Sequence, residues 1–329
     1  MSRSVLVITN QEDLHASSVI AHLNEMGVKV FRLNTEKLLT ELTVSLSQTA
    51  AGESLLLHDT ISGRTLRGRD IGVVYFRRPA PPDVPSLWQD NPQAAAVVAS
   101  EARWFLRWLY AYLGDRPWVS AQPSVIDRAS CKPLQMKLAR SLGMRVPDTC
   151  YGNSALDLQA LSVTSPLVVK AIRETGFEAN DVFHAFYTAA VDPEALIASP
   201  ELLSGHINFF QHKVAKDHEL RVTWIDGRCY SARIHSQSGP EGARLDWRRV
   251  NWQELDYSVT ALPSELEQQI SAYCIGLGLN FGAFDFIVTQ RGEHVFLECN
   301  ANGQWLWLDE KLDIGIAQGI AQALRSRLG

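Results

Sequence analysis

The alternation of apolar and polar stretches in the first third of the chain predicts an α/β domain. An apolar run at Val5–Thr9 precedes a helical pattern at Ala16–Met26 and a second apolar run at Val28–Leu33. A strand, a helix and a strand in this order predict a βαβ unit with parallel strands. A further strand at Ile71–Phe76 and a long helix at Ala94–Leu113 complete this amino-terminal domain.

In the remainder of the chain two pairs of strand patterns are separated by short turn signals, which predicts hairpins. Asp226-Gly227 separates two strand patterns and is a strong turn signal. Arg291-Gly292 lies in a short polar break between two further apolar arms, the second of which starts at Val295. The other expected elements are strands at Leu167–Lys170 and Phe209–Val214, helices ending at Gly143, Leu277 and Leu328, and a polar loop at Arg173–Asn180 that could act as a lid.

The composition is that of a globular protein with two or three domains. The chain has 329 residues, 46% of them hydrophobic, and a formal net charge of -5, so it lacks the basic excess of general nucleic-acid binders. The amino-terminus has no signal-peptide pattern, and no apolar run reaches membrane-spanning length. We therefore expect a cytoplasmic protein that binds neither nucleic acid nor membrane.

The cysteines give no sign of a disulfide framework or of structural zinc. Their number is odd and no CxxC pair occurs. We expect buried thiols at all five positions, which are Cys131, Cys150, Cys229, Cys274 and Cys299.

The last hairpin carries three oxygen-bearing side chains on one face. Counting outward from Arg291-Gly292 places Asp285 opposite Glu298, and Asn300 follows two residues later on the same face. Opposed carboxylates repel unless a cation or a shared proton lies between them. Oxygen ligands without His or Cys suit Mg2+. The alternative is a solvated strand face with incidental acids, which the apolar character of both arms argues against.

Basic side chains elsewhere supply candidate contacts for an anionic ligand. Lys132 and Lys170 stand at the start of a helix and at the end of a strand, and neither a P-loop nor a GxGxxG motif is present. Arg77-Arg78 follows a strand, where the pair could face an anionic substrate or brace a domain interface. Trp104 and Trp108 on the long helix are expected to be core or dimer-contact residues rather than a cofactor site.

Five segments together resemble the microviridin-type graspetide ligases of the ATP-grasp superfamily. The last is the most specific, since Asn-Gly-Gln-Trp-Leu-Trp is not general to ATP-grasp enzymes. Ala301 stands where that family has proline, and Cys131 where it has asparagine. The segments are Val74–Pro79, Lys132–Gln135, Glu219–Val222, Asp246–Arg249 and Glu298–Trp307.

The resemblance implies an ATP-grasp fold in three parts, which combines α/β and α+β organisation. These are an α/β pre-ATP-grasp domain at residues 1–122, a central lid subdomain at 123–207, and a carboxy-terminal antiparallel-sheet subdomain with the magnesium site at 208–329. It also implies ATP and Mg2+ as cofactors, and these site residues: Lys132 and Lys170 at the phosphates, Gln211 and the Val214 backbone at adenine, Glu219 at ribose, Asp285, Glu298 and Asn300 at the metal, and Arg221, Arg233 and Arg248 near the reacting groups.

The function implied by the resemblance is closure of side-chain cross-links in a ribosomal precursor peptide that has a leader and a core. An Asp or Glu side chain would become an acyl phosphate, which a Ser, Thr or Lys side chain would attack to give an ester or amide. Related enzymes also favour a homodimer. Two alternatives remain open: a carboxylate-amine ligase for a small metabolite or a protein terminus, and a nucleotide-binding sensor without turnover. The simple register of the Asp226-Gly227 hairpin puts Arg221 and Arg233 on opposite faces.

Overall fold

The N-terminal domain is built on a parallel sheet with the strand order β2-β1-β6-β7. The computed structural model describes residues 3–173, 176–179 and 182–328. The βαβ prediction is confirmed, because the first two strands are parallel neighbours with a helix between them. The strands are β1 (Ser4–Thr9), β2 (Val30–Asn34), β6 (Ile71–Phe76) and β7 (Trp118–Val119).

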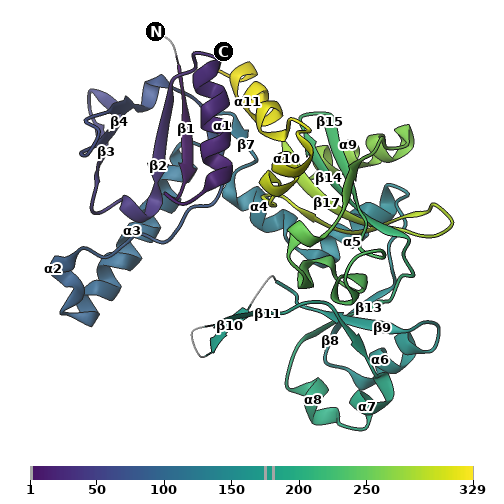
Figure 1. Cartoon of the computed structure of the whole chain (residues 1–329). Coiled ribbons are helices and arrows are strands. Elements are labelled where there is room, and N and C mark those ends of the chain that lie inside the picture. The colour runs from purple at the N-terminus through teal and green to yellow at the C-terminus, as the bar shows by residue number, and fades with distance from the viewer. Residues whose placement is uncertain (1–2, 174–175, 180–181, 329) are drawn as a thin grey trace.

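Different elements cover the two faces of this sheet. On one face α1 (Leu14–Glu25) packs beside α11 (Ile316–Ser326), so the two ends of the chain lie close together (Figure 1). Asp13 starts α1 by accepting hydrogen bonds from two backbone N–H groups of the first turn. The other face carries α3 (Pro92–Tyr112) and a small sheet of β3 (Leu42–Thr49), β4 (Gly52–Asp59) and β5 (Thr65–Arg67).

The central subdomain is a four-stranded antiparallel sheet with the order β12-β9-β13-β8. Its core contains Leu158, Leu167, Leu203 and Phe210. A two-stranded hairpin of β10 (Gly176–Ala179) and β11 (Val182–Ala185) projects from this unit (Figure 1). The other elements are β8 (Thr149–Gly152), α6 (Ala155–Ser162), β9 (Leu167–Lys170), β12 (Ala189–Val191), α7 (Pro193–Ile197), α8 (Pro200–Ser204) and β13 (Asn208–His212).

The C-terminal sheet has the strand order β16-β15-β14-β17-β18 and is antiparallel throughout. Asp226 and Gly227 form its tightest turn with φ angles of 51° and 93°, which suits an Asp-Gly pair. Its elements are β14 (His218–Ile225), β15 (Arg228–Ile234), β16 (Tyr257–Val259), β17 (Phe281–Val288) and β18 (His294–Asn300). One face packs on α4 (Pro123–Ala129), α5 (Lys132–Ser141) and α9 (Ser264–Leu277), and the other meets α10 (Leu306–Leu312), α11 and the N-terminal domain.

Short elements complete the chain. They are α2 (Ser86–Gln89) and five 3-10 turns at Thr35–Lys37, Gly68–Asp70, Glu241–Arg244, Trp247–Arg249 and Trp252–Glu254. None of the helices in the described part of the chain has the length and the apolar character needed to cross a bilayer.

Three expectations differ from the structure. The expected boundary at residues 207 and 208 divides a sheet, because β13 is hydrogen-bonded to β8 and β9, and α4 and α5 pack on the C-terminal sheet instead of on the central one. Residues 176–179 form a strand rather than a loop, and residues 174–175 and 180 of the segment predicted as a lid lie outside the described residues.

The cysteine prediction was correct for two positions only. Cys274 and Cys299 are buried between α9 and the C-terminal sheet, whereas Cys131 is exposed just before α5. Cys150 and Cys229 are partly exposed on strands. All five are free thiols.

Candidate functional site

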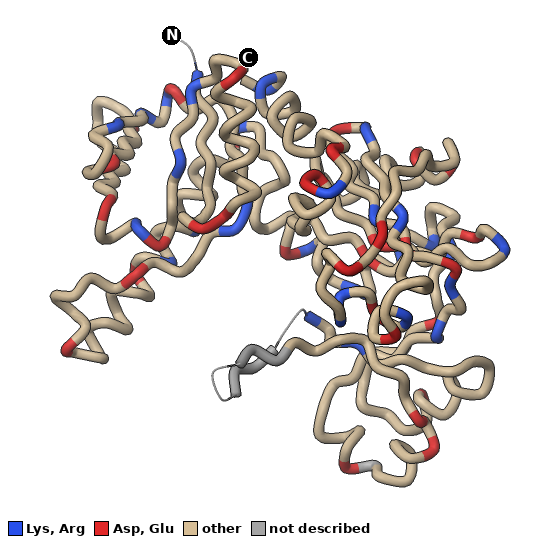
Figure 2. Tube along the Cα trace, viewed as in Figure 1, with Lys and Arg blue, Asp and Glu red and all other residues tan. Residues whose placement is uncertain are grey.

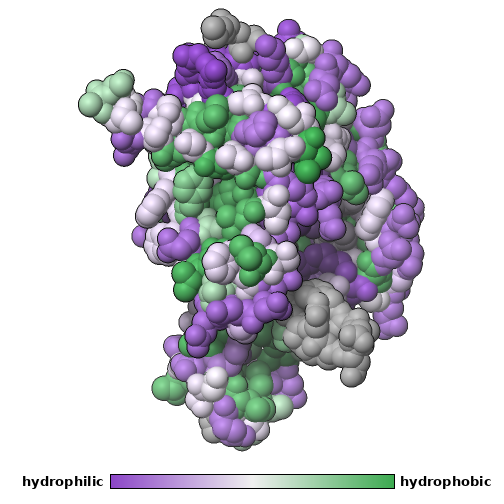
Figure 3. All heavy atoms as spheres, turned by 90° about the vertical axis from the view of Figure 1, so that its left-hand side faces the viewer, coloured by the Kyte–Doolittle hydropathy of each residue, from purple (hydrophilic) through white to green (hydrophobic). Residues whose placement is uncertain are grey.

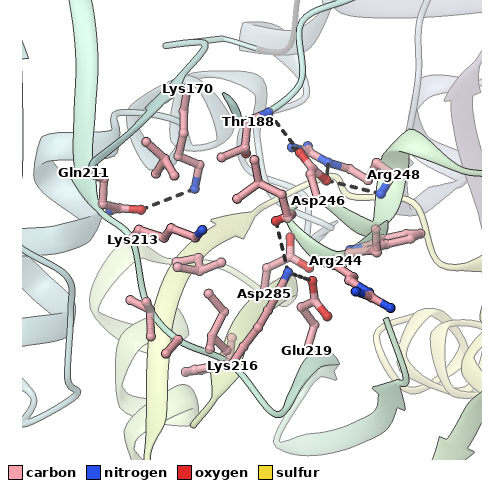
Figure 4. Close-up of a pocket in the computed structure, with 18 of the residues that line it drawn as sticks. Lys170, Thr188, Gln211, Lys213, Lys216, Glu219, Arg244, Asp246, Arg248 and Asp285 are labelled. Carbon is pink, nitrogen blue, oxygen red and sulfur yellow. Dashed lines mark hydrogen bonds and ion pairs between the residues drawn. The ribbon is translucent and has the colours of Figure 1, made fainter. Parts of the chain in front are cut away.

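A cleft between the central sheet and the C-terminal sheet has a volume of about 530 Å3. Basic and acidic positions of the chain trace lie close together where the two sheets face each other (Figure 2). Lys170 and Gln211 enter from the central sheet, and Glu219 and Asp285 from the C-terminal sheet (Figure 4). Seven of the eleven residues that the sequence predicted for the site line this cleft: Lys170, Gln211, Val214, Glu219, Arg248, Asp285 and Glu298.

The predicted pairing of Asp285 with Glu298 is confirmed. The turn itself is centred on Arg291, because Val288 lies opposite His294. An irregularity after Asp285 leaves Leu297 as an extra residue and moves the register by one position, which restores the predicted pair. Leu297 and Glu298 both line the cleft as a result.

Both carboxylates are paired with cations. Arg221 lies opposite Asp285 on the neighbouring strand, and its Nη1 is 2.8 Å from each carboxylate oxygen of Asp285. Glu298 forms an ion pair with Lys132, the first residue of α5. Asn300 donates to Oε1 of Glu298 at 3.3 Å. Lys132, Arg221 and Asn300 therefore belong to the same cluster as the carboxylates, although they do not line the cleft.

The pKa values of the two carboxylates shift in opposite directions. Burial raises the pKa of Asp285, and Arg221 offsets this only in part. Burial acts on Glu298 in the same sense, but Lys132 and Lys170 outweigh it and hold the pKa of Glu298 well below its usual range. Glu298 is thus the more strongly anionic member of the pair.

The donor set fits a hard divalent cation. Two carboxylates and one side-chain amide lie at neighbouring positions on two paired strands, and carboxylate and amide oxygens are ligands that Mg2+ prefers. The described residues contain no cluster of three or more His, Cys, Asp and Glu side chains suited to a metal, because the third donor here is Asn300. Lys132 forms an ion pair with Glu298, and Arg221 forms one with Asp285.

The cationic end of β9 lies against the predicted adenine side of the cleft. Lys170 Nζ is 3.5 Å from Oε1 of Gln211 and lies over the Phe209 ring at 5.6 Å from its centroid. Burial lowers the pKa of Lys170, while Glu298 opposes the change. Gln211 is 2% exposed and also donates to Thr149. This arrangement can hold a phosphate and present a fixed amide to a base.

Glu219 lies deeper in the cleft as a buried acceptor. Its two carboxylate oxygens accept hydrogen bonds from Lys216 and Ser236. Burial raises its pKa, and Lys216 counteracts the shift. A carboxylate held in this way can accept hydrogen bonds from ligand hydroxyl groups.

A short Asp-x-Arg segment forms another wall of the cleft. Asp246 accepts from Nε and Nη2 of Arg248 at 2.9 and 2.8 Å, and from the backbone N–H of Thr188 at 3.1 Å. Burial would raise the pKa of Asp246, but the hydrogen bonds from Arg248 prevail and lower it to about 2. Arg249 donates to the carbonyl of Thr188 at 2.7 Å. The segment therefore fixes the chain between the β10–β11 hairpin and β12.

Arg233 is the one predicted site residue that the structure places elsewhere. In the β14–β15 pair, Arg221 lies opposite Ala232 and Leu220 opposite Arg233, so the expected difference in face is confirmed. Arg233 is exposed and lines a separate cavity with His218 and His294. The pairing of β14 with β15 has no bulge that would bring both arginines to one face.

Several charged residues of the cleft were not expected from the sequence, among them Asp246 and Arg244. Asp246 belongs to the Asp246–Arg249 segment, and its spacing to Arg248 is a usable signal for a side-chain pair. Lys213 and Lys216 also line the cleft. No local pattern marks these two lysines, since they lie in the connection between β13 and β14.

Comparison with known proteins gives a consistent result. Residues 4–125 match the family model of the MvdD pre-ATP grasp domain. A RiPP-associated ATP-grasp ligase of Chryseobacterium gregarium, solved with ADP and a leader and core peptide, has a TM-score of 0.89 and 25% identity over 98% of this chain and 97% of its own. The chain is an ATP-grasp ligase.

Two further solved structures agree with the ligase in fold. Macrocyclase MdnC from Microcystis aeruginosa MRC, bound with precursor peptide MdnA, has a TM-score of 0.82 at 24% identity over 98% and 99% of the two chains. ATP-grasp ligase PsnB, complexed with a phosphomimetic variant of its minimal precursor, Mg and ADP, has a TM-score of 0.76 at 19% identity over all of both chains. No curated protein matches the chain. The predicted fold class and the resemblance to graspetide ligases are confirmed.

Proposed function

We propose that the ligase closes cross-links in a ribosomal precursor peptide at the expense of ATP. Asp or Glu side chains of the core become acyl phosphates, and Ser, Thr or Lys side chains of the same peptide displace the phosphate. The observation that best supports this proposal is the carboxylate pair on β17 and β18. The pair lines one cleft with Lys170 and Arg248, and it forms ion pairs with Lys132 and Arg221. A structural relative with 25% identity was solved with ADP, a leader and a core peptide.

The proposed nucleotide site uses side chains that line the cleft together with Lys132 beside it. Lys170 and Lys132 contact the phosphates, Gln211 and the Val214 backbone the adenine, and Glu219 the ribose. Gln211 is buried and Glu219 is held by Lys216 and Ser236, so both are fixed before the nucleotide arrives. Asp285, Glu298 and Asn300 would hold Mg2+, which when bound neutralises phosphate charge during phosphoryl transfer.

The chemistry needs two displacements. A carboxylate oxygen of the peptide attacks the γ-phosphorus, the bond from that phosphorus to the β-phosphate oxygen breaks, and ADP leaves. The hydroxyl or amine of the second side chain then attacks the acyl carbon, phosphate leaves, and the nucleophile loses its proton. Each cross-link makes the peptide lighter by one water. Arg248 at the cleft wall and Arg221 beside Asp285 stabilise the anionic groups that form.

The ligase is also proposed to be a cytoplasmic homodimer. On α3, Val97, Trp104 and Trp108 are 61%, 50% and 62% exposed, which excludes the core alternative for both tryptophans. Apolar side chains are visible on the side of the molecule that bears the N-terminal domain (Figure 3), and exposed apolar groups of this size are typical of interfaces. Light scattering should give twice the mass of the chain, and Trp104→Gln with Trp108→Gln should reduce it to one chain.

The proposed activity is tested by mass spectrometry. The ligase is incubated with ATP, Mg2+ and the precursor peptide encoded beside it, in parallel with an Asp285→Asn, Glu298→Gln variant. Product lighter by one water per ring, absent with the variant, is the expected result. ADP release without a lighter peptide would instead favour a small-metabolite ligase, and no ADP release would favour a sensor.

A further inference from the structure

The residues that follow Asn300 join the C-terminal sheet to the N-terminal domain. Arg77, directly after β6, donates through Nη1 to the backbone oxygen of Asn302 at 2.5 Å and to its Oδ1 at 2.8 Å. The Asn302 amide donates back to the Arg77 carbonyl. The two residues are 225 positions apart in the chain, so this reciprocal contact links two domains. It also decides between the two roles considered for Arg77, in favour of the domain interface.

Burying the charged side chain of Arg77 in this contact is unfavourable in free energy. Its side chain is among the largest that are fully buried, with 1% exposed. No carboxylate forms an ion pair with it in the described part of the chain. A buried charge without a counter-charge is costly, and an apolar pair could hold two domains together without that cost. The cost therefore indicates a task that depends on the directions of these hydrogen bonds.

Asn302, Gly303 and Gln304 form a turn after β18. Arg77 holds one side of this turn, and Arg221, which pairs with the proposed metal ligand Asp285, holds the other. Arg221 donates through Nη2 to the backbone oxygen of Gln304 at 2.7 Å, while its Nη1 holds Asp285. The N–H of Gly303 donates to the Asn300 carbonyl at 3.1 Å. A Cβ at Gly303 would lie 2.6 Å from Cβ of Ala283 and 3.0 Å from Nη2 of Arg221. No larger residue fits without moving β17 or Arg221.

We propose that Asn302-Gly303-Gln304 is a coupling turn, through which Arg77 of the N-terminal domain positions the metal ligands Asn300 and Asp285. Arg77 and Asn302 are positioning residues in this scheme. The turn contacts Asn300 through the backbone and Asp285 through Arg221, so a change at Arg77 reaches both arms of the hairpin. The inference rests on the proposed magnesium site but not on the identity of the peptide.

The coupling turn also gives a role to a sequence motif in which no residue is assigned to the nucleotide or the metal. Asn302, Gly303 and Gln304 form the first half of the Asn-Gly-Gln-Trp-Leu-Trp sequence, yet none of them lines the nucleotide cleft. Their side chains and backbone instead bind two arginines from different domains. A contact of this type commonly tunes metal affinity by about 10- to 100-fold through the ligands it orients.

The test measures how much Mg2+ strengthens ADP binding. Calorimetry gives the Kd for ADP with Mg2+ and with EDTA, for the full chain and for Arg77→Lys and Asn302→Ala. Each variant should reduce the ratio of the Kd with EDTA to the Kd with Mg2+ by about 10-fold or more, while the Kd with EDTA stays unchanged. The double variant should lose no more than the worse single one, because the two side chains act through one contact.

Arg327→Lys is the matched control. Arg327 also makes a two-point contact between distant segments, with both carboxylate oxygens of Asp226 at 2.5 Å, but away from the cleft. It should lower the melting temperature without changing the Mg2+ ratio. Asn302→Ala retains the backbone acceptor for Arg77, and it serves as the test variant if Arg77→Lys does not fold.

Two results would overturn the inference. Folded Arg77→Lys and Asn302→Ala proteins with the wild-type ratio would leave the contact as a domain brace only. If Mg2+ does not strengthen ADP binding to the wild-type protein, both the proposed metal site and the proposed role of the coupling turn are wrong. If Mg2+ strengthens ADP binding in the wild type and less so in the variants, but no cross-linked peptide forms, the proposed substrate is contradicted and the coupling turn is still supported.

Discussion

The two faces of the C-terminal sheet place similar arginines in opposite environments. On the cleft face, Arg221 is 6% exposed and bonds to Asp285 and to the Gln304 backbone. On the other face, Arg233 is exposed beside a cavity of about 390 Å3 that His218 and His294 also line. Side-chain alternation on adjacent strands separates them. Resemblance to a family supplies a residue type, whereas strand register decides which face that residue serves.

The largest effect should come from the carboxylate pair on the cleft face. Asp285→Asn with Glu298→Gln removes both ionised donors, and we expect a loss of at least about 1000-fold in cross-link formation. Rates are measured by mass spectrometry at saturating ATP. Asp217→Asn, which lies beside the other cavity, is the control and should keep its activity. A double variant that still closes rings at a tenth of the normal rate would exclude a role for the pair.

The next effect concerns the cation at the end of β9. Lys170→Met removes a charge that faces Gln211 and Glu298 in the cleft, and we expect kcat/KM for ATP to fall by about 100-fold. The exposed Lys137 on α5 provides Lys137→Met as a control for loss of a lysine. Equal activity of the two variants would show that Lys170 does not contact the nucleotide.

A smaller effect is expected on the pH dependence of stability, where His15 and His294, one near each face of the sheet, should differ. His15 packs edge-on against the buried Trp305, with ring centroids 4.9 Å apart, and burial together with Arg77 lowers the pKa of His15 to about 3. A depressed folded pKa means that the unfolded chain takes up the proton first. Stability is therefore complete above about pH 6.5 and decreases by up to about 1.4 kcal/mol per pH unit below it.

Urea unfolding at several pH values tests this prediction. The decrease in unfolding free energy between neutral pH and pH 5.5 or so should become shallower in His15→Gln. His294, whose pKa is lowered by burial and by His218 and Arg233, is only half-buried, so His294→Gln should flatten the curve less. Identical pH profiles for wild type and His15→Gln would contradict the assignment.

The smallest effect is expected on the far face. Arg233→Gln should change cross-link formation by less than about threefold, because Arg233 is exposed and lies across the sheet from the carboxylates. The same assay as for the carboxylate variants is used. A loss approaching that of Asp285→Asn with Glu298→Gln would instead show that Arg233 takes part in the chemistry, and that the two faces do not differ in function.

Local patterns predicted much of the fold. The βαβ start follows from the spacing of apolar positions, and the β14–β15 hairpin follows from Asp226-Gly227, because few other residue pairs adopt two positive φ angles. The pairing of Asp285 with Glu298 was predicted from a turn that the chain does not form. The bulge at Leu297 compensates for a turn that is centred on Arg291 instead of between Arg291 and Gly292, and no sequence signal marked it.

The sequence by itself determined which residue types could form the site and which strands would carry them. Only the tertiary structure decided that Lys132 reaches Glu298, that Arg221 rather than Arg233 holds Asp285, and that Arg77 binds Asn302. The reason is physical. Apolar periodicity and turn geometry act within a few neighbouring residues, whereas a buried charge finds its partner only after distant segments have packed and excluded water.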